Sequence, residues 1–528
     1  MAPHRPRRRI ANGDAVLTPE TTPQSTPQST PDPDRAPAPP GEPRLREADE
    51  ALLNALRALL GPEGVREGPD AAPWLREPRD RLTGRAALIA RPADAEQTAR
   101  ILRLCAEARV PVVPHAGGTG LVGGQLAPQG MAPEPAPVVL SVDRMNRIRQ
   151  VSPEDDAMIV EAGVILADAQ AAAEAADRLF PLSLASEGSA RIGGLLATNA
   201  GGVNVLRYGN ARDLTLGIEA ALPDGSVLRG LKLLRKDNAG YDLRHLLIGS
   251  EGTLGVITAA ALRLFPRPAE RAAAWLGTPS PETALALLHL LRGAFAEQLT
   301  AFELMHRTGM DFLAERLPDL RQPMTPPPEW AVLAEVSGPA GSAQRPRLEA
   351  ALAEAVERGL AADGVLAESE AQRAQLWRVR EAIPEANRKV GAISSHDVSA
   401  PLSRIARFIA LGREAIGRID PALRINCFGH LGDGNLHYNV FPPKGASRGD
   451  YERLRGRIQR TVHDLIAELG GSFSAEHGVG RLKTADLRRY GDPAALRMMA
   501  AIKRALDPAG VMNPGAALPG DPPPAAPD

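Results

Sequence analysis

The sequence has little cysteine, no excess of either charge and no long apolar run. Only two cysteines, Cys105 and Cys427, occur in 528 residues, both among apolar neighbours, which indicates a reducing compartment and no disulfide framework. The 62 basic and 63 acidic residues give a net charge of −1, so nothing points to a nucleic-acid or acidic-membrane partner. No apolar run approaches the ~18 residues that a transmembrane helix requires. We therefore expect a cytoplasmic protein without a membrane span, with peripheral membrane association left open.

Both ends of the chain lack the composition of a folded core. Arg5 and residues 7–9 make the N-terminus basic, but no apolar segment follows, which argues against a secretory signal. Residues 14–44 are rich in Pro, Thr, Ser and Gln, and such a stretch buries too little apolar surface to fold. We predict that 1–46 is a disordered Pro-rich segment and that 518–528 is a disordered tail.

The chain between these ends is long enough for two or three domains. Its character changes near Pro266 and Pro268, after which long amphipathic helices dominate. We predict a first domain over 47–268, a second over 269–460 and a C-terminal helical segment over 461–517. Apolar spacing predicts helices at 47–60, 94–108, 164–178, 282–298, 343–358, 371–389, 402–419, 451–469 and 493–506, and strands at 110–114, 138–142, 157–161, 215–222, 226–234, 254–265, 331–336 and 395–399.

Two short glycine-rich segments carry most of the chemistry of the chain. Residues 427–439 read Cys-Phe-Gly-His-Leu-Gly-Asp-Gly-Asn-Leu-His-Tyr-Asn, and residues 475–480 read Ala-Glu-His-Gly-Val-Gly. If Gly-Asp-Gly makes a tight turn between two strands, the imidazoles of His430 and His437 converge on one point. The alternative is a pair of structural histidines in a hairpin.

The second segment completes a possible set of metal ligands. Glu476 can supply an oxygen ligand, which leaves His477 as a base, or alternatively as a structural histidine in a tight loop. Two imidazoles and one carboxylate with an open coordination position are typical of a catalytic divalent metal site.

Three further glycine-rich runs fall within the first predicted domain, at 114–125, 188–202 and 248–258. Glycines let the backbone approach a ligand closely and turn its N–H groups inward, which suits a pyrophosphate. The spacing fits neither a Walker loop nor a GxGxxG element. For each run alone an ordinary packed turn is the alternative, but three runs in one domain favour one extended dinucleotide cofactor.

The order of these loops and the two histidine segments, with a closing Asn513-Pro-Gly, resembles the FAD-linked D-2-hydroxyacid dehydrogenases of the vanillyl-alcohol-oxidase/PCMH flavoprotein superfamily. This group includes D-lactate and D-2-hydroxyglutarate dehydrogenases and the glycolate oxidase flavin subunit. The resemblance spans about 50–517. It implies an α+β protein with a PCMH-type two-subdomain FAD-binding domain, an α+β substrate (cap) domain with an antiparallel sheet, and a C-terminal helical segment that returns to the flavin.

The resemblance also implies which residues contact the cofactor. Non-covalent FAD is expected, because superfamily members that attach FAD covalently carry a His inside a Gly-Gly-His loop, where this chain has Thr119. The residues expected to line FAD are Pro114, Gly117, Gly118, Thr119, Gly120, Leu121, Gly123, Gly124, Gly188, Ser189, Gly193, Gly194, Thr198, Asn199, Gly201, Gly202, Glu251, Gly252, Ile257 and Asn513.

The implied reaction is oxidation of a D-2-hydroxy acid, with the hydride passing to flavin N5. His430, His437 and Glu476 would hold a divalent metal, with zinc favoured and manganese or iron as alternatives. His477 would be the general base. Arg380 matches the carboxylate-binding arginine of the family, Asn439 is a further candidate for substrate binding, and each has a purely structural alternative.

The chain departs from the D-2-hydroxyglutarate pattern at two places. That enzyme type has a Thr four residues after the arginine and a Lys before the next strand's Tyr/His-Asp, where this chain has Pro384 and Ser395. Because those family residues would contact a distal carboxylate, lactate-like D-hydroxy acids stay open as substrates. His396 is a candidate to replace part of the lost charge, or is structural.

Other functions remain as alternatives. No Cys-rich iron–sulfur motif is present, so electrons are expected to leave to an electron-transfer flavoprotein, a quinone or a cytochrome. The chain could instead be the flavin subunit of a glycolate-oxidase-like complex, or a flavin-free metal-binding scaffold. Alkyl-glycerone-phosphate-synthase-like chemistry is disfavoured, because its loop carries consecutive histidines where this chain has Ala475-Glu476. The oligomeric state, a homodimer included, stays open.

Overall fold

The computed structural model describes residues 44–519, so most of the disorder predicted for 1–46 and 518–528 lies outside the described residues. For residues 45 and 46 the prediction is wrong, because Leu45 packs on the first hydrophobic core and the N–H of Arg46 donates to the carbonyl oxygen of Arg109. The first part of the described chain forms a small sheet with the strand order β1-β2-β4-β3, in which β4 runs parallel to both β2 and β3. Helices α1 and α2 pack on it through Leu56 and Leu102. The elements are α1 (Glu50–Leu60), η1 (Pro62–Gly64), β1 (Val65–Arg66), η2 (Gly68–Trp74), β2 (Leu88–Ala90), α2 (Ala95–Ala108), β3 (Val112–His115) and β4 (Val138–Ser141).

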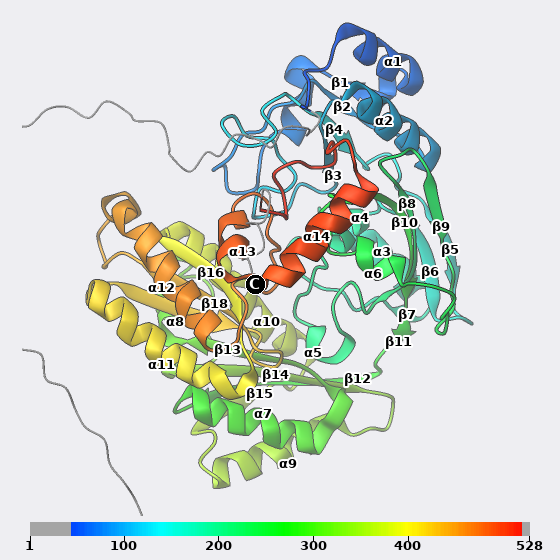
Figure 1. Ribbon diagram of the computed structural model, residues 1–528. Coiled ribbons are helices and arrows are strands. Elements are labelled where there is room, and N and C mark those ends of the chain that lie inside the picture. The colour runs from blue at the N-terminus through cyan, green and yellow to red at the C-terminus, as the bar shows by residue number, and fades with distance from the viewer. Residues whose placement is uncertain (1–43, 520–528) are drawn as a thin grey trace, which may run out of the picture. The chain divides into compact units, whose positions relative to one another are not determined.

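A five-stranded antiparallel sheet follows, with the order β5-β6-β10-β8-β9. The short strands β7 and β11 pair with each other, and Figure 1 labels both at the lower end of this sheet. The elements are β5 (Ile148–Ser152), β6 (Ala157–Glu161), α3 (Leu166–Ala175), β7 (Arg178–Leu179), α4 (Ile192–Ala197), α5 (Val205–Tyr208), β8 (Thr215–Ala221), β9 (Val227–Gly230), α6 (Leu243–Leu247), β10 (Val256–Arg263) and β11 (Phe265–Pro266).

The second half is built on a seven-stranded antiparallel sheet with the order β15-β12-β14-β13-β17-β18-β16. Its strands are β12 (Glu270–Thr278), β13 (Leu299–His306), β14 (Trp330–Gly338), β15 (Asp363–Leu366), β16 (Ser394–Ser399), β17 (Arg424–Gly429) and β18 (Asn435–Phe441). The three sheets confirm the predicted α+β class, with a two-part first half and an antiparallel sheet in the second (Figure 1).

Helices cover the two faces of the seven-stranded sheet unequally. One face packs on α7 (Pro281–Phe295), α9 (Gln344–Glu357), α11 (Leu402–Ile419) and α12 (Arg455–Glu468), with η3 (Ala296–Gln298) after α7 and η4 (Arg448–Leu454) before α12. The other face packs on α8 (Arg307–Arg316) and α10 (Glu370–Val390). On this second face the polar side chains of β16 and β18 meet the loop that follows α12.

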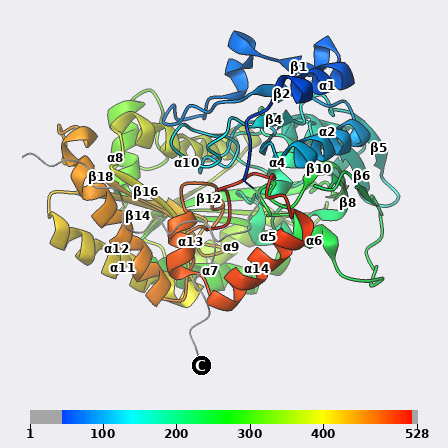
Figure 2. The same cartoon turned by 45° about the horizontal axis from the view of Figure 1, so that its top comes forward.

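The last segment contains α13 (Thr484–Tyr490) and α14 (Pro493–Leu506), and the chain after α14 pairs back onto β3 through Val112 and Met512. Figure 2 shows these helices in orange and red across the front of the molecule. Among the described residues no helix has both the length and the apolarity to cross a membrane.

Local signals explain why several elements were predicted well. The side chain of Asp94 accepts the Gln97 N–H at 2.7 Å and begins α2, and Asp492 caps α14 in the same way with Pro493 at its first position. The predicted bounds of β6, α11 and α14 are confirmed. The predicted helix 282–298 ends at Phe295 in α-helical form, and the strands β12 and β13 were not predicted.

Candidate active site

The hairpin β17–β18 brings two imidazoles together. Gly434 has a φ of +84°, and a Cβ there would lie 2.4 Å from the carbonyl oxygen of Ala400, so the turn requires glycine. His430 begins this turn and His437 lies in β18, with ring centroids 5.6 Å apart. The predicted turn and the convergence of the two histidines are therefore confirmed.

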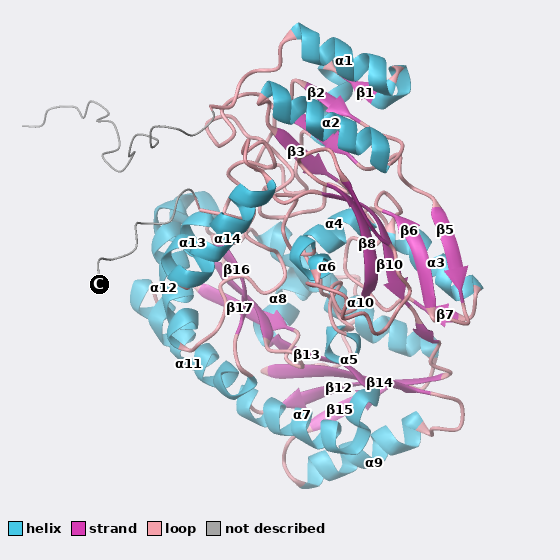
Figure 3. Ribbon diagram, turned by 45° about the vertical axis from the view of Figure 1, so that its right-hand side comes forward, coloured by secondary structure: helices cyan, strands magenta, loops and turns pink. Residues whose placement is uncertain are grey.

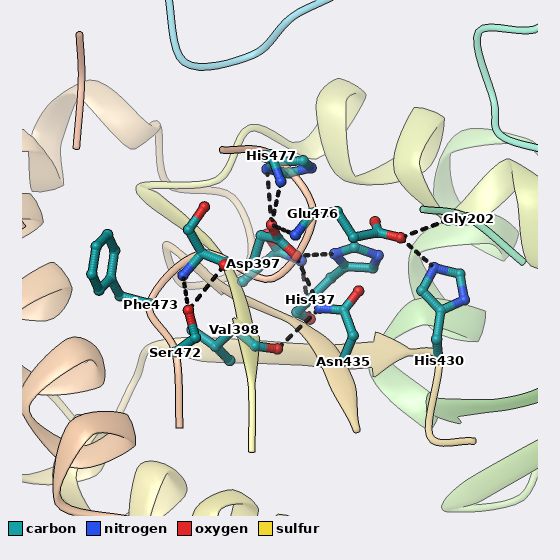
Figure 4. A network of polar contacts seen from close by, with 12 residues as sticks. Gly202, Asp397, Val398, His430, Asn435, His437, Ser472, Phe473, Glu476 and His477 are labelled. Carbon is teal, nitrogen blue, oxygen red and sulfur yellow. Dashed lines mark hydrogen bonds and ion pairs between the residues drawn. The ribbon is translucent and has the colours of Figure 1, made fainter. Parts of the chain in front are cut away.

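Glu476 reaches the same place from the loop between α12 and α13. Its Oε1 lies 3.7 Å from His430 Nε2 and accepts the N–H of Gly202 at 2.9 Å. One ligand atom each from His430, His437 and Glu476 lies within 4.8 Å of the others. Figure 4 shows the three side chains pointing toward one another, with Gly202 from the first half of the chain beside them.

Asp397 on β16 holds this loop in place. Its Oδ2 accepts the backbone N–H groups of Glu476 and His477, both at 2.9 Å, and its Oδ1 accepts from Asn435 at 2.9 Å. Burial by itself would raise the pKa of Asp397, but the nearby imidazoles of His477 and His437 outweigh it, so the pKa lies well below its usual range. The carboxylate is therefore charged, and it fixes Glu476 and His477 together (Figure 4).

Glu303 on β13 joins the metal-ligand candidate His430 to Arg380. Its Oε1 lies 2.7 Å from His430 Nδ1, and its Oε2 accepts from Arg380 at 2.7 Å. Burial alone would raise the pKa of Glu303, but His430 and Arg380 lower it to about 2. Burial would likewise lower the pKa of His430, yet Glu303 raises it to about 9. Neither Glu303 nor Asp397 was singled out from the sequence.

The donor set fits a divalent metal ion. The pKa of His437 is lowered to about 3, chiefly by burial, so its imidazole is neutral and offers a lone pair. Glu303 accepts at Nδ1 of His430, the orientation that presents Nε2 to a cation in place of a proton. A second group, Asp397, Glu476 and His477, is equally compact, but Asp397 already binds two backbone N–H groups.

The other predicted residues of the substrate site separate into two groups. Arg380 is buried on α10, stacked over Phe428 at 4.9 Å, and Asn439 lies on the same sheet face as His437. His477 lies near Asp397, its Nδ1 3.6 Å from Oδ2, and burial is the main cause of its lowered pKa. His396 is on the opposite face of β16, where its ring contacts His463 of α12 at 3.3 Å. The structure therefore does not bring His396 to the cluster.

The positions that the substrate pattern singled out lie on β16 and α10, the elements that also carry Asp397 and Arg380. Ser395 is exposed and pairs with Asn439, so its side chain faces the same side of the sheet as Asp397. Pro384 is exposed on α10, one turn beyond Arg380.

The three glycine-rich runs pack against one another. A Cβ at Gly117 would lie 2.4 Å from the carbonyl oxygen of Ser189, and one at Gly252 would lie 2.8 Å from Pro114. The Glu251 N–H donates to Ala197. The three runs, far apart in the sequence, therefore lie side by side, as one extended cofactor site would require.

Some side chains predicted to line the cofactor are used within the protein. The carboxylate of Glu251 accepts the N–H groups of Val479 and Gly480 at 2.8 and 2.7 Å. Asn513 donates to the carbonyls of Gly124 and Glu251, and Asn199 accepts the Arg212 N–H. The fold by itself therefore accounts for polar residues at positions 199, 251 and 513, without any contact to the cofactor.

His115 is a polar group of the first run that its protein neighbours leave unsatisfied. Both ring nitrogens are buried without a hydrogen-bond partner among the described residues, and the ring lies beside Gly118. Burial lowers the pKa of His115 to about 4, so the ring is neutral. A buried orphan of this kind fits a site for a polar ligand.

Comparisons with known proteins also indicate an FAD-binding protein. The family model described as an FAD binding domain matches residues 86–230, and the model described as the C-terminal domain of FAD linked oxidases matches residues 267–517. The crystal structure of p-cresol methylhydroxylase with substrate bound aligns with a TM-score of 0.68 at 16% identity, covering 89% of this chain and 97% of that one. The fold and these domains define an FAD-linked oxidoreductase.

The sequence relatives narrow the class. The mitochondrial D-2-hydroxyglutarate dehydrogenase of Arabidopsis thaliana is 34% identical over 90% of this chain and 83% of its own length. That of Bos taurus is 37% identical over 90% of this chain and 84% of its own length. The chain belongs to the family of FAD-linked D-2-hydroxyacid dehydrogenases.

Proposed function

We propose that the protein oxidises a D-2-hydroxy acid to the 2-oxo acid with the help of a divalent metal and non-covalently bound FAD. Bound FAD would supply the acceptor, its N5, for the hydride that leaves the substrate Cα. The hydroxyl proton goes to the protein, and the two electrons leave to a non-NAD acceptor such as an electron-transfer flavoprotein, a quinone or a cytochrome. The relatives' activity supports this reaction type.

The contact between Glu476 and Gly202 carries the proposal. Gly202 ends a glycine-rich run of the FAD-binding domain, and its N–H donates to the carboxylate that faces His430 at 3.7 Å. A group that could hold the substrate hydroxyl therefore directly adjoins a backbone predicted to line the flavin. This adjacency is what hydride transfer requires, because the reacting atoms must be within van der Waals reach.

His430, His437 and Glu476 would hold the metal, zinc by preference with manganese or iron as alternatives. The metal would supply Lewis acidity that lowers the pKa of the substrate hydroxyl. Glu303 and Asp397 orient this set, one through His430 and the other through the backbone of Glu476. Because these two carboxylates hold the ligand residues His430 and Glu476 in place, the site is rigid before the substrate binds.

His477 acts as the base that takes the hydroxyl proton. Asp397 lies on the opposite side of its ring, 3.6 Å from Nδ1. This carboxylate stabilises the imidazolium that forms when Nε2 accepts the proton. The same carboxylate fixes the His477 backbone, so the base is held at both ends.

Arg380 binds the substrate carboxylate. Its guanidinium has five N–H donors, and Glu303 occupies only the side formed by Nε and Nη2. Glu303 thereby locks the planar group in one orientation, which favours two parallel hydrogen bonds to a second carboxylate. Asn439 on the same sheet face is a further donor for the substrate.

The substrate that fits best is a D-2-hydroxy acid with a short or uncharged distal group, such as D-lactate. By the family resemblance, Ser395 and Pro384 replace a lysine and a threonine that would contact a distal carboxylate, and both side chains are exposed. The competing substrate is D-2-hydroxyglutarate, the dicarboxylate after which the relatives are named.

The experiment is anaerobic bleaching of the flavin by a panel of D- and L-2-hydroxy acids, with and without a chelator. We expect bleaching by D-acids alone, loss of bleaching after chelation, and recovery with zinc or manganese. Bleaching that survives complete metal removal contradicts the metal-dependent reaction. If the flavin of the purified protein is bleached but the protein cannot pass electrons to an artificial acceptor, the result favours the alternative that the chain is the flavin subunit of a glycolate-oxidase-like complex.

A further inference from the structure

A cavity of about 600 Å³ lies apart from the histidine cluster, where the first half of the chain meets the second. Helix α5 and the strands β10 and β11 form one wall, and α7, η3 and the start of β13 form the other. Figures 1 and 3 show α5 beside the strands of the seven-stranded sheet. The lining residues are Leu206, Arg207, Tyr208, Arg263, Phe265, Arg292, Ala296, Glu297 and Leu299.

Three arginines converge on this space, which we call the arginine cavity. Arg207, Arg263 and Arg292 are each half-buried, and none forms an ion pair with a carboxylate among residues 44–519. The Nε of Arg263 is buried with no hydrogen-bond partner in the same part of the chain. Glu297 is the one acidic side chain in the lining, so a strong positive charge remains uncompensated.

The aromatic rings in the wall are already covered by guanidinium groups. Arg207 stacks over Tyr208 at 4.9 Å and Arg263 over Phe265 at 4.6 Å, and the two rings meet edge to face at 4.8 Å. The rings therefore hold the arginines rather than offering a stacking surface to a base. A ligand would be recognised by its charge, with planar guanidinium groups paired to carboxylate or phosphate oxygens.

Arg292 connects the arginine cavity to the candidate metal site. Its Nη2 donates to the carbonyl oxygen of Gly432 at 2.7 Å, in the turn that begins at His430. Leu206 of the cavity wall packs against the same glycine, where a Cβ would lie 2.7 Å from its Cδ2. A ligand that draws on Arg292 would act directly on this turn.

We propose that the arginine cavity binds a small multivalent anion, a molecule with two or more carboxylate or phosphate groups, at a site separate from that of the substrate. A volume of about 600 Å³ suits a ligand of metabolite size. The site does not depend on the proposed reaction, since none of its residues takes part in it.

Calorimetric titration of the flavin-loaded protein tests the proposal, with citrate as the carboxylate probe and inorganic pyrophosphate as the phosphate probe. We expect saturable binding of one anion per chain by at least one probe. Arg263→Gln should weaken it by about tenfold or more, because a charge-assisted contact is lost. Arg267→Gln is the matched control, since Arg267 belongs to the same segment but pairs with Glu174 on the surface.

Each result of these titrations either supports or contradicts the proposed anion site. Binding of citrate alone assigns the site to a polycarboxylate, and binding of pyrophosphate alone assigns it to a phosphate ligand. No saturable binding by either probe overturns the proposal, as does equal weakening by both substitutions. If Arg263→Gln lowers the thermal midpoint of the free protein, Arg292→Gln replaces it in the same comparison.

Discussion

Oε1 of Glu303 lies 2.7 Å from Nδ1 of His430, and Oε2 of the same carboxylate holds the guanidinium of Arg380. One buried side chain on β13 thus connects a candidate metal ligand to the candidate substrate anchor. A substitution of Glu303 can therefore disturb metal binding by His430 and substrate binding by Arg380 without changing either of these two residues.

Glu303→Gln is expected to weaken metal binding by about 10- to 100-fold, because the partner that orients His430 loses its charge. Metal affinity is measured by competition with a chromophoric chelator, and the metal content of the purified protein by mass spectrometry. Glu335→Gln is the control: Glu335 is a buried carboxylate on the neighbouring strand β14, bonded to Arg373 and Trp377. Equal metal loss in both variants would refute the orienting role of Glu303.

Arg380→Met is expected to destabilise the fold as well as the substrate complex. It leaves the carboxylate of Glu303, 1% exposed, with His430 as its one remaining charged partner among the described residues. Removing one member of a buried pair typically costs about 3–5 kcal/mol. The thermal unfolding midpoint should fall, and the double variant Glu303→Gln/Arg380→Met should regain part of the loss. A midpoint equal to that of the unmodified protein would show that the pair adds nothing to stability.

His477→Gln is expected to lower kcat by about 10²- to 10⁴-fold with little change in KM, as for loss of a general base. Flavin content and metal content should stay unchanged, since His477 is the base rather than a ligand. The rate of anaerobic flavin reduction in stopped-flow measurements reports this step alone. His245→Gln, on the surface of α6, should reduce flavin at the normal rate. A His477→Gln enzyme with normal reduction kinetics would require another base.

Ser395→Lys is expected to shift substrate preference toward dicarboxylates. The new ammonium group would extend from the exposed end of β16, on the side of the sheet that carries Asn439, and pair with a distal carboxylate. We expect the ratio of kcat/KM for D-2-hydroxyglutarate to that for D-lactate to rise about tenfold. Ser403→Lys, an exposed position on α11, controls for the added charge. An unchanged ratio would mean that position 395 does not face the distal group.

Glu161→Gln is expected to change stability in a pH-dependent way. Burial alone would raise the pKa of Glu161, but bonds from Arg147 and Arg149 lower it below 4.5. A group with a lowered folded-state pKa adds stability above its unfolded pKa and loses it as the pH falls through the folded value. The variant should therefore unfold at a lower temperature at neutral pH, with the difference shrinking below pH 4.5. Glu107→Gln, at an exposed position of α2, should show no such trend.

The sequence was informative where local chemistry decides the structure. The helix α14 begins at Pro493, directly after the capping Asp492, and has regular apolar spacing, so its bounds could be predicted directly. The hairpin at 424–440 could be predicted because Gly434 has a backbone conformation that few other residues adopt. The metal-ligand candidates lie in the two motifs, so their convergence needed only that turn and one loop.

Elements and side chains whose roles depend on contacts with distant parts of the chain could not be predicted from the sequence. Strand β13 follows α7 with only η3 between them, and a short apolar run has the same appearance in a strand and in a buried helix. Glu303 lies alone in that run, and its partner His430 is 127 residues away. Asp397 stood beside the more conspicuous His396, and only the strand alternation tells which of the two faces the site. An isolated acid within an apolar strand is the signal that would have found Glu303, whereas Asp397 lies in a polar strand and carries no such signal.

The guanidinium of Arg481 donates to the carbonyls of Gly123 and Gly124 in the first glycine-rich run, more than three hundred residues earlier in the chain, and its Nη2 also donates to Asn513. Protein synthesis proceeds from the N-terminus, so these carbonyls have no such partner until the ribosome has passed Arg481. The first glycine-rich run, predicted to line the dinucleotide, thus gains this support only after residues 481 and 513 have been made. Enzyme copies that terminate early would be expected to release as colourless apoprotein rather than as partly active flavoprotein.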